Sequence, residues 1–192
     1  MMHMKKHLIR LLLSLLFLVG TAMSCDEEPA IPTDIPCILK DVELYHWDNA
    51  GELPKEPAEN KIPKEAYILE IRLLTEVVED GVESYYDNHF TQHILSDAIK
   101  KIQIFTETAF NDKFPQGAEV TSCFYDYPKI IDNYQQTDYT VDGGSIWRVD
   151  KTNRIYKALI IIPQPGEYHF RVVLTKESGE TIERVSEPIS LY

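Results

Sequence analysis

The stretch Tyr67-Ile68-Leu69-Glu70-Ile71-Arg72-Leu73 carries the clearest pattern in the chain. Its odd-numbered residues are all apolar, and its even-numbered positions include Glu70 and Arg72. Because successive side chains of a β-strand point to opposite sides, this alternation predicts a strand with one buried face.

The same period of two recurs elsewhere along the chain. Between residues 168 and 174 the even positions are apolar, and residues 155–162 end in the continuous apolar run 159–162, which predicts a central strand covered on both faces. Other candidate strands, separated by turn signals rich in Gly, Pro, Asn and Asp, are 38–47, 82–86, 99–106, 119–125 and 181–191. Glu177-Ser178-Gly179 predicts a short hairpin.

Helix signals are few. Residues 91–101 predict one or two helical turns, with Ser96 as a cap, and no long amphipathic stripe occurs. Short strands with frequent turns predict an all-β fold, a single antiparallel β-sandwich of about 7–9 strands.

Composition limits the classes of function. The chain has 192 residues, enough for one domain, and 31 acidic against 19 basic side chains give a net charge of −12. An apolar content of 44% excludes a disordered chain. The acidity argues against nucleic acid as a partner, and against an anionic lipid surface held by charge alone.

Residues 1–24 have the three parts of a secretory signal peptide. A basic start with Lys5, Lys6 and Arg10 precedes the apolar run 11–19, and small residues follow. The apolar run is about half the length that a transmembrane helix needs. We expect this segment to be removed on export.

The residues that follow resemble a bacterial lipoprotein. Ala22-Met23-Ser24-Cys25 is similar to a lipobox, although Ala22 stands where Leu is usual, and the resemblance implies that Cys25 is lipidated. The acidic cluster 26–28 looks like the surface-export signal of Bacteroidetes lipoproteins. Residues 25–36 are expected to be the lipidated Cys and an acidic, Pro-rich tether, and residues 37–192 the sandwich domain. The implied location is the outer membrane, facing the cell exterior.

The stretch 165–174, followed by a Gly turn and a final strand, resembles the closing hairpin of immunoglobulin-like modules. Together with the lipobox and the tether, it is similar to small Bacteroidetes lipoproteins grouped as domains of unknown function. This resemblance implies an immunoglobulin-like sandwich in the cell envelope and carries over no activity.

Cys37 and Cys123 remain as a pair once Cys25 is lipidated. They either form a disulfide, which an oxidising envelope permits, or are two buried thiols. No metal site and no cofactor are predicted: His89 and His93 have a chelating spacing only on a helix, and the acidic residues follow no calcium-loop repeat.

Aromatic residues gather between residues 124 and 147, interleaved with Asp, Asn and Gln. Rings beside amides and carboxylates suit a carbohydrate, and the ligand-binding residues predicted here are Tyr134, Tyr139 and Trp147. The other interpretation is that these rings cap the core.

No nucleophile elbow, phosphate loop or dinucleotide motif occurs, so we expect no enzyme. The sequence therefore predicts a non-catalytic surface binding module for a glycan or a protein, attached to the membrane by its lipid anchor. The alternative is a structural or accessory subunit of a surface or pilus-like envelope complex.

Overall fold

The computed structural model describes residues 34–78, 92–127, 139–150 and 153–192, all within one compact unit that spans residues 32–192. These residues are almost entirely strand and loop, and the helices among them are three-residue 3₁₀ turns. No helix in the described ranges is long and apolar enough to cross a membrane. The all-β class predicted from the period-two pattern is confirmed.

The strands are β1 (Asp34–Asp48), β2 (Lys61–Ile62), β3 (Tyr67–Val77), β4 (Gln92–Thr106), β5 (Phe124–Asp126), β6 (Tyr139–Asp142), β7 (Ser145–Asp150), β8 (Arg154–Leu159), β9 (Gly166–Tyr168), β10 (Phe170–Lys176), β11 (Thr181–Val185) and β12 (Ile189–Leu191). The 3₁₀ turns are η1 (Ala58–Asn60), η2 (Lys64–Ala66) and η3 (Thr121–Cys123).

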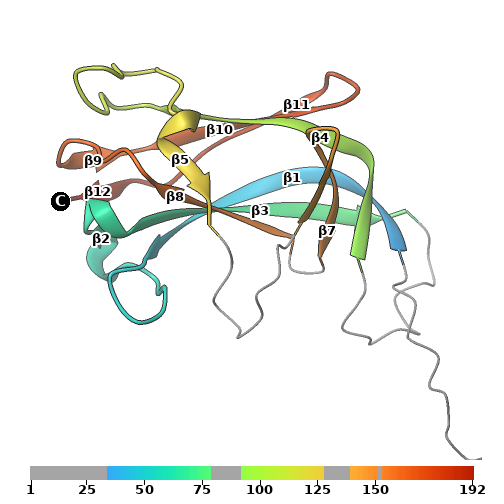
Figure 1. Ribbon diagram of the computed structural model, residues 1–192, viewed down its shortest axis with the longest axis horizontal. Coiled ribbons are helices and arrows are strands. Elements are labelled where there is room, and N and C mark those ends of the chain that lie inside the picture. Colours follow the sequence, from blue (N-terminus) through green and yellow to red (C-terminus); the bar gives the residue numbers. More distant parts are fainter. Residues whose placement is uncertain (1–33, 79–91, 128–138, 151–152) are drawn as a thin grey trace, which may run out of the picture. The chain divides into compact units, whose positions relative to one another are not determined.

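The main sheet runs in the order β11-β10-β4-β1-β3-β8-β5, and the hairpin β6–β7 joins it at β4. A second sheet has the order β2-β12-β9. The first half of β4 pairs with β1, and its second half pairs with β10, with a break in register between them. Asp41 of β1 forms an ion pair with Arg184 of β11, three strands away in the sheet order, so the sheet folds back over itself at β4. Figure 1 shows β4, β10 and β11 lying over β1 and β3.

The core fills the space between these two layers. Leu69, Ile71 and Leu73 of β3 are buried together with Val172 and Leu174 of β10. Aromatic rings join the layers at one end, where Tyr67 stacks on Phe170 with 5.4 Å between the ring centroids. Each fully buried Leu or Ile contributes about 1.5–3 kcal/mol of burial free energy. The structure is therefore sandwich-like.

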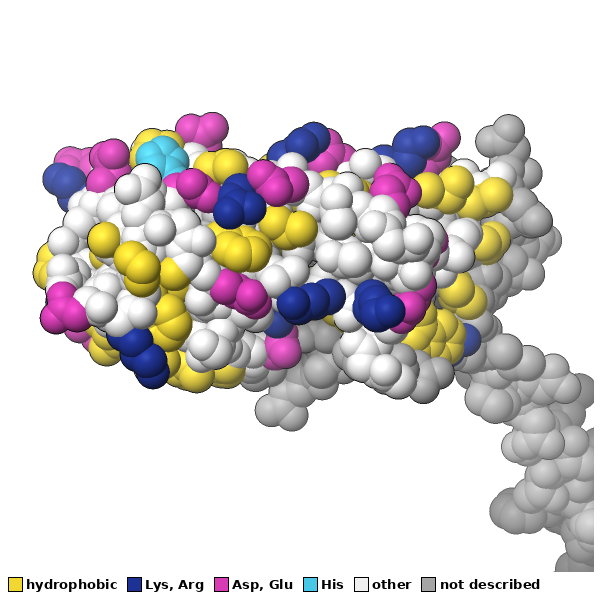
Figure 2. Space-filling view, turned by 90° about the horizontal axis from the view of Figure 1, so that it is seen from above, with side chains coloured by type: hydrophobic (Ala, Val, Ile, Leu, Met, Phe, Trp, Pro, Cys, Tyr) yellow, Lys and Arg dark blue, Asp and Glu magenta, His cyan; other side chains and the backbone are white. Residues whose placement is uncertain are grey.

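The outer side of the β4–β10–β11 layer is a solvated surface. Figure 2 shows basic and acidic side chains interspersed over this side, with small hydrophobic areas among them. Arg171 lies over the ring of Phe105 and forms ion pairs with Glu107 and Glu183. Such exposed pairs contribute little to stability and keep the surface polar.

Two details of the fold differ from the prediction. The strand pairs β1–β4 and β2–β12 are parallel, so the sheets are mixed rather than purely antiparallel, and the described residues form twelve strands. The prediction of helical turns at 91–101 is wrong, because residues 92–101 of this segment belong to strand β4, which runs from Gln92 to Thr106. Ser96, the expected cap, lies at the break in register, where its neighbour Asp97 accepts a hydrogen bond from the backbone of Ser178.

The ends of two strands also differ. Strand β1 begins at Asp34, within the expected tether; Ile35 is buried, and the carbonyl of Pro36 accepts a hydrogen bond from the amide of Val78. Strand β8 ends at Leu159, and residues 160–162 are exposed by 58%, 37% and 44% rather than covered. The amides of Ile160 and Ile161 both point to the carbonyl of Cys123 and do not continue the hydrogen-bond ladder between β8 and β5.

The disulfide is not formed, because Cys37 and Cys123 are free and buried thiols. The strand register places Trp47 level with Tyr125 through β3 and β8. Trp47 lies ten residues along β1 from Cys37, or about 30 Å at 3.3 Å per residue. A disulfide requires Cα atoms within about 7 Å. Burial raises the pKa of Cys37 to about 11, which keeps this thiol protonated.

A histidine ties the two layers together near the C-terminus. His46 of β1 contacts the hydroxyl of Tyr67 through Nδ1 at 2.8 Å and the carbonyl of Glu187 through Nε2 at 2.9 Å. Since a carbonyl only accepts, Nε2 carries the proton, and the neutral ring accepts from Tyr67 at Nδ1. Burial raises the pKa of Tyr67 well above its ordinary value and lowers the pKa of His46. The neutral imidazole is thus the form that fits.

This contact predicts a loss of stability in mild acid. The folded state holds His46 below its unfolded pKa of about 6.5, so the unfolded chain binds the proton more readily as the pH falls through that value. The free energy of unfolding should fall between pH 7.5 and pH 5, and the fall should be smaller in His46→Gln, whose amide does not titrate. Urea unfolding across this range measures it. The nearby groups His169 and Glu187 are present in both proteins. Parallel curves for the two proteins would contradict the assignment.

Candidate functional site

The outer side of the β1–β3–β8–β5 layer carries a set of aromatic and charged side chains that the strand register places in rows. Tyr45, Glu70 and Tyr156 lie opposite one another, and Tyr127 continues this row, because its amide donates to the carbonyl of Tyr156. The next row is Trp47, Ile68, Ala158 and Tyr125, and the row on the other side is Glu43, Arg72 and Arg154. We call these three rows the aromatic face.

A small second core lies at the centre of the aromatic face. Ile68, Tyr156 and Ala158 are 1%, 3% and 6% exposed, and Trp47 and Tyr127 pack against them. This cluster is separate from the main core between the layers. The centre of the face is therefore a closed floor, and its more exposed rings lie toward the two outer strands.

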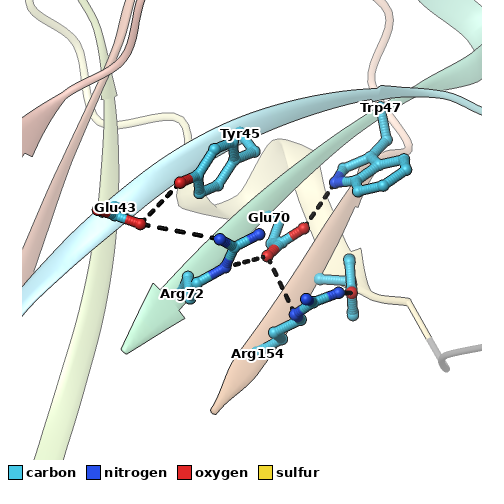
Figure 3. A network of polar contacts seen from close by, with 7 residues as sticks. Glu43, Tyr45, Trp47, Glu70, Arg72 and Arg154 are labelled. Atoms are coloured by element: carbon cyan, nitrogen blue, oxygen red, sulfur yellow. Dashed lines mark hydrogen bonds and ion pairs between the residues drawn. The ribbon is translucent and has the colours of Figure 1, made fainter. Parts of the chain in front are cut away.

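The carboxylate of Glu70 is fully buried beside this floor. One oxygen, Oε2, accepts a hydrogen bond from the indole nitrogen of Trp47 at 2.7 Å. The other, Oε1, lies 3.0 Å from Nε of Arg72 and 3.5 Å from Nε of Arg154 (Figure 3). A buried charge is tolerated only when it is paired and hydrogen-bonded, and Glu70 meets this condition with three partners from three strands.

Arg72 in turn holds the ring of Tyr45. Its guanidinium carbon lies 4.1 Å from the centroid of that ring, and Glu43 accepts a hydrogen bond of 2.7 Å from the Tyr45 hydroxyl (Figure 3). This hydrogen bond to the carboxylate raises the pKa of Tyr45, which keeps the phenol neutral. The ring remains 37% exposed. It is an exposed aromatic surface held in one orientation.

Tyr125 and Tyr127 form the opposite edge of the aromatic face. Their rings meet edge to face with 6.2 Å between the centroids, and Tyr125 is 42% exposed. The hydroxyl of Tyr127 lies 3.4 Å from Oδ1 of Asn49, the residue after β1. The ring of Tyr127 thus bridges toward β1 across the floor, and Tyr125 is the exposed ring on this edge.

The residues predicted as ligand contacts are not part of the aromatic face. Trp147 lies on β7, beyond β4 and level with the beginning of β1, and the guanidinium of Arg148 lies 4.3 Å from its ring centroid. Its buried Nε1 has no hydrogen-bond partner in the described part of the chain. Tyr139 is described only for its backbone in β6, and Tyr134 and Cys25 lie outside the described residues. The joint role of Tyr134, Tyr139 and Trp147 stays a prediction.

Sequence reasoning missed Tyr45 and Trp47. Both follow the period-two pattern of β1, as Glu70 and Arg72 follow that of β3, so the pattern assigns each pair to one face of its own strand. It does not say which strands are neighbours. Tyr125 and Tyr127 belong to the aromatic run that the sequence singled out, but the hydroxyl of Tyr127 contacts Asn49, which lies 78 positions earlier in the chain.

The histidines and acidic residues considered as metal ligands in the sequence do not form a site in the described residues. His93 lies in strand β4, and its Nδ1 is 3.2 Å from Oδ1 of Asn153. Residues four apart in a strand are separated by about 13 Å, which is too far for both to bind one metal ion. His89 lies outside the described residues. Within the described ranges, no three His, Cys, Asp or Glu side chains gather closely enough to hold a metal ion.

The network predicts that Glu70 stabilises the domain. Glu70→Gln keeps an acceptor for Trp47 but removes the charge between two arginines, and it should lower the free energy of unfolding by about 1–3 kcal/mol. Glu76→Gln is the matched control, because Glu76 lies on the same strand in an exposed pair with Lys40, and it should cost less than about 0.5 kcal/mol. Urea unfolding at neutral pH measures both. Equal effects would show that the Glu70 network adds nothing to stability.

No curated protein and no solved structure matches the chain significantly. A family model described as a domain of unknown function, DUF5034, matches residues 39–187, which covers the sandwich from β1 to the loop before β12. The chain belongs to the DUF5034 family.

Proposed function

We propose that this protein is a cell-envelope lipoprotein whose folded domain is a non-catalytic binding module for a glycan. In this proposal residues 1–24 are the signal peptide, Cys25 carries the lipid, and the domain faces the cell exterior beyond a short acidic tether. The aromatic face replaces Tyr134, Tyr139 and Trp147 as the proposed principal contact surface.

The observation that carries the proposal is the pair of exposed rings, Tyr45 and Tyr125, on a sheet face whose polar groups are held in place. Sugars present C–H faces that pack on aromatic rings and hydroxyl groups that need donors and acceptors at the edge. Glu70 and Glu43 orient Arg72 and the hydroxyl of Tyr45 at the first of these rings before any ligand arrives. Groups held in place in advance lose little conformational entropy on binding.

A protein ligand is supported less well by the same face. Centres of protein interfaces are usually depleted of charged residues, whereas the middle of this face contains Glu70, Arg72 and Arg154. A peptide or protein is therefore an outcome of the binding test and not the proposal.

A second candidate function, a structural subunit of an envelope complex, is favoured by a different surface. Three consecutive isoleucines, residues 160–162, are exposed at the end of β8, beside the short edge strand β5. Exposed apolar runs mark assembly surfaces in soluble domains. Replacing these isoleucines by serine would test this role through the size of detergent-extracted complexes.

Binding is tested by affinity electrophoresis of the full chain, purified in detergent, through gels that contain a neutral polysaccharide. The panel consists of hydroxyethyl cellulose, xylan, glucomannan, laminarin and dextran. One of them should retard the protein, and Tyr45→Ala and Tyr125→Ala should each weaken its binding at least about tenfold, or about 1.4 kcal/mol.

The controls separate binding from folding. Tyr192→Ala removes a tyrosine that is 59% exposed and lies outside the aromatic face, and it should leave the retardation unchanged. Tyr45→Phe keeps the ring and should retain most of the binding. If no polysaccharide in the panel retards the protein, or if Tyr192→Ala acts like Tyr45→Ala, the glycan-binding role is wrong.

The proposed location has its own test. Protease added to intact cells should digest the domain if it faces outward, while a periplasmic marker protein stays intact. A Cys25→Ala variant should lose membrane attachment and appear in the soluble fraction, because the lipid is its anchor. Protection of the domain until the cells are lysed would place it in the periplasm and remove the basis for capture of an external glycan.

A further inference from the structure

The two exposed rings of the aromatic face are far apart. Tyr45 lies on β1 and Tyr125 on β5, and two strands, β3 and β8, lie between them. Three interstrand steps of about 4.8 Å and an offset of one row, about 7 Å, place their Cα atoms about 16 Å apart. One sugar ring is too small to contact both tyrosines.

Among the described residues, the floor between the rings offers no enclosure for a single sugar. Ile68 and Ala158 are almost completely covered by their neighbours, and Trp47 and Tyr127 pack on them. Small ligands gain affinity when a site surrounds most of their surface. A ligand on a closed floor has to gain its affinity from contacts along its length.

The charges on this face sum to zero. Glu43 and Glu70 stand against Arg72 and Arg154, and all four are joined through one network (Figure 3). The chain as a whole carries −12, so a polyanion would be repelled by the surrounding domain. Charge balance therefore favours an uncharged chain.

We infer that the aromatic face binds the interior of a neutral, extended polysaccharide chain, with one sugar on Tyr45 and another on Tyr125. This inference rests on the proposed glycan-binding function and specifies its ligand class. Because each sugar unit of an extended chain advances it by about 5 Å, the span of about 16 Å that the strand spacing gives corresponds to about four linked sugars. The two rings then act as two linked contact points, and their joint occupation raises the affinity above that of either ring alone.

Titration calorimetry of the full chain in detergent tests this with oligosaccharides of increasing length. The probes are fragments, from the disaccharide to the hexasaccharide, of the polysaccharide that retards the protein most strongly. The hexasaccharide should bind at least about tenfold more tightly than the disaccharide, with the gain complete near four sugars. In Tyr45→Ala and in Tyr125→Ala the two lengths should bind within about twofold of each other, whereas Tyr192→Ala should keep the full dependence on length.

The outcomes separate this inference from the function on which it rests. A disaccharide that binds as tightly as the hexasaccharide to the unaltered protein would overturn the two-ring inference and leave glycan binding in place. The same holds if only one of the two tyrosine variants loses the length dependence. A preference for polygalacturonate over the neutral chains would overturn the neutral ligand class. Failure of every polysaccharide in the retardation assay would remove the proposed function itself.

Discussion

Strand β3 directs Leu69, Ile71 and Leu73 into the main core, and toward the opposite side it directs a carboxylate, that of Glu70, which is also fully buried. A buried carboxylate has to be paired, and its partners here come from β1, from β3 itself and from β8. The pairing aligns three strands on their outer side as the apolar core aligns them on the inner side. It also sets the orientation of the Trp47 indole and, through Arg72, of the Tyr45 ring.

The two outer sides of the sandwich differ as a consequence. On the β4–β10–β11 layer, Arg171 pairs with exposed carboxylates and the surface is solvated (Figure 2). On the β1–β3–β8–β5 layer, a closed apolar floor supports rings that stay exposed at its two edges. Among the described residues, the second arrangement combines fixed polar groups with two aromatic rings that are 37% and 42% exposed, and for that reason the proposed binding role is assigned to it.

The fold-back of the sheet follows from β4. One long strand pairs with β1 at its beginning and with β10 at its end, and a break in register between them changes its direction. Residues 91–101 were predicted as one or two helical turns, with Ser96 as a cap. Local signals of this kind depend on short-range hydrogen bonds, whereas the strand pairing here connects residues about 60–80 positions apart, which outweighs the local preference.

The aromatic face shows the same difference between what local patterns predict and what long-range pairing decides. The alternation in residues 67–73 was enough to predict a strand with Leu69 on one side and Glu70 on the other, and the alternation in 168–174 was enough to predict a second strand of the same kind. Neither pattern indicated that Glu70 is buried, since a polar residue on the non-core side of a strand is ordinarily solvated. The free state of Cys37 and Cys123 was equally undetermined, because the spacing of two cysteines does not give their distance in the fold.

The amino-acid sequence by itself determined the all-β class, most strand positions and the inward side of the two strands with the clearest alternation, 67–73 and 168–174, because these depend on a period of two that is local to each segment. The tertiary structure alone decided that β1, β3, β8 and β5 are neighbours in a fixed register. That register brings Tyr45, Trp47, Glu70, Arg72 and Tyr125 onto one face from three distant parts of the chain. Strand order depends on long-range pairing and on how the core closes, and no local pattern carries that information.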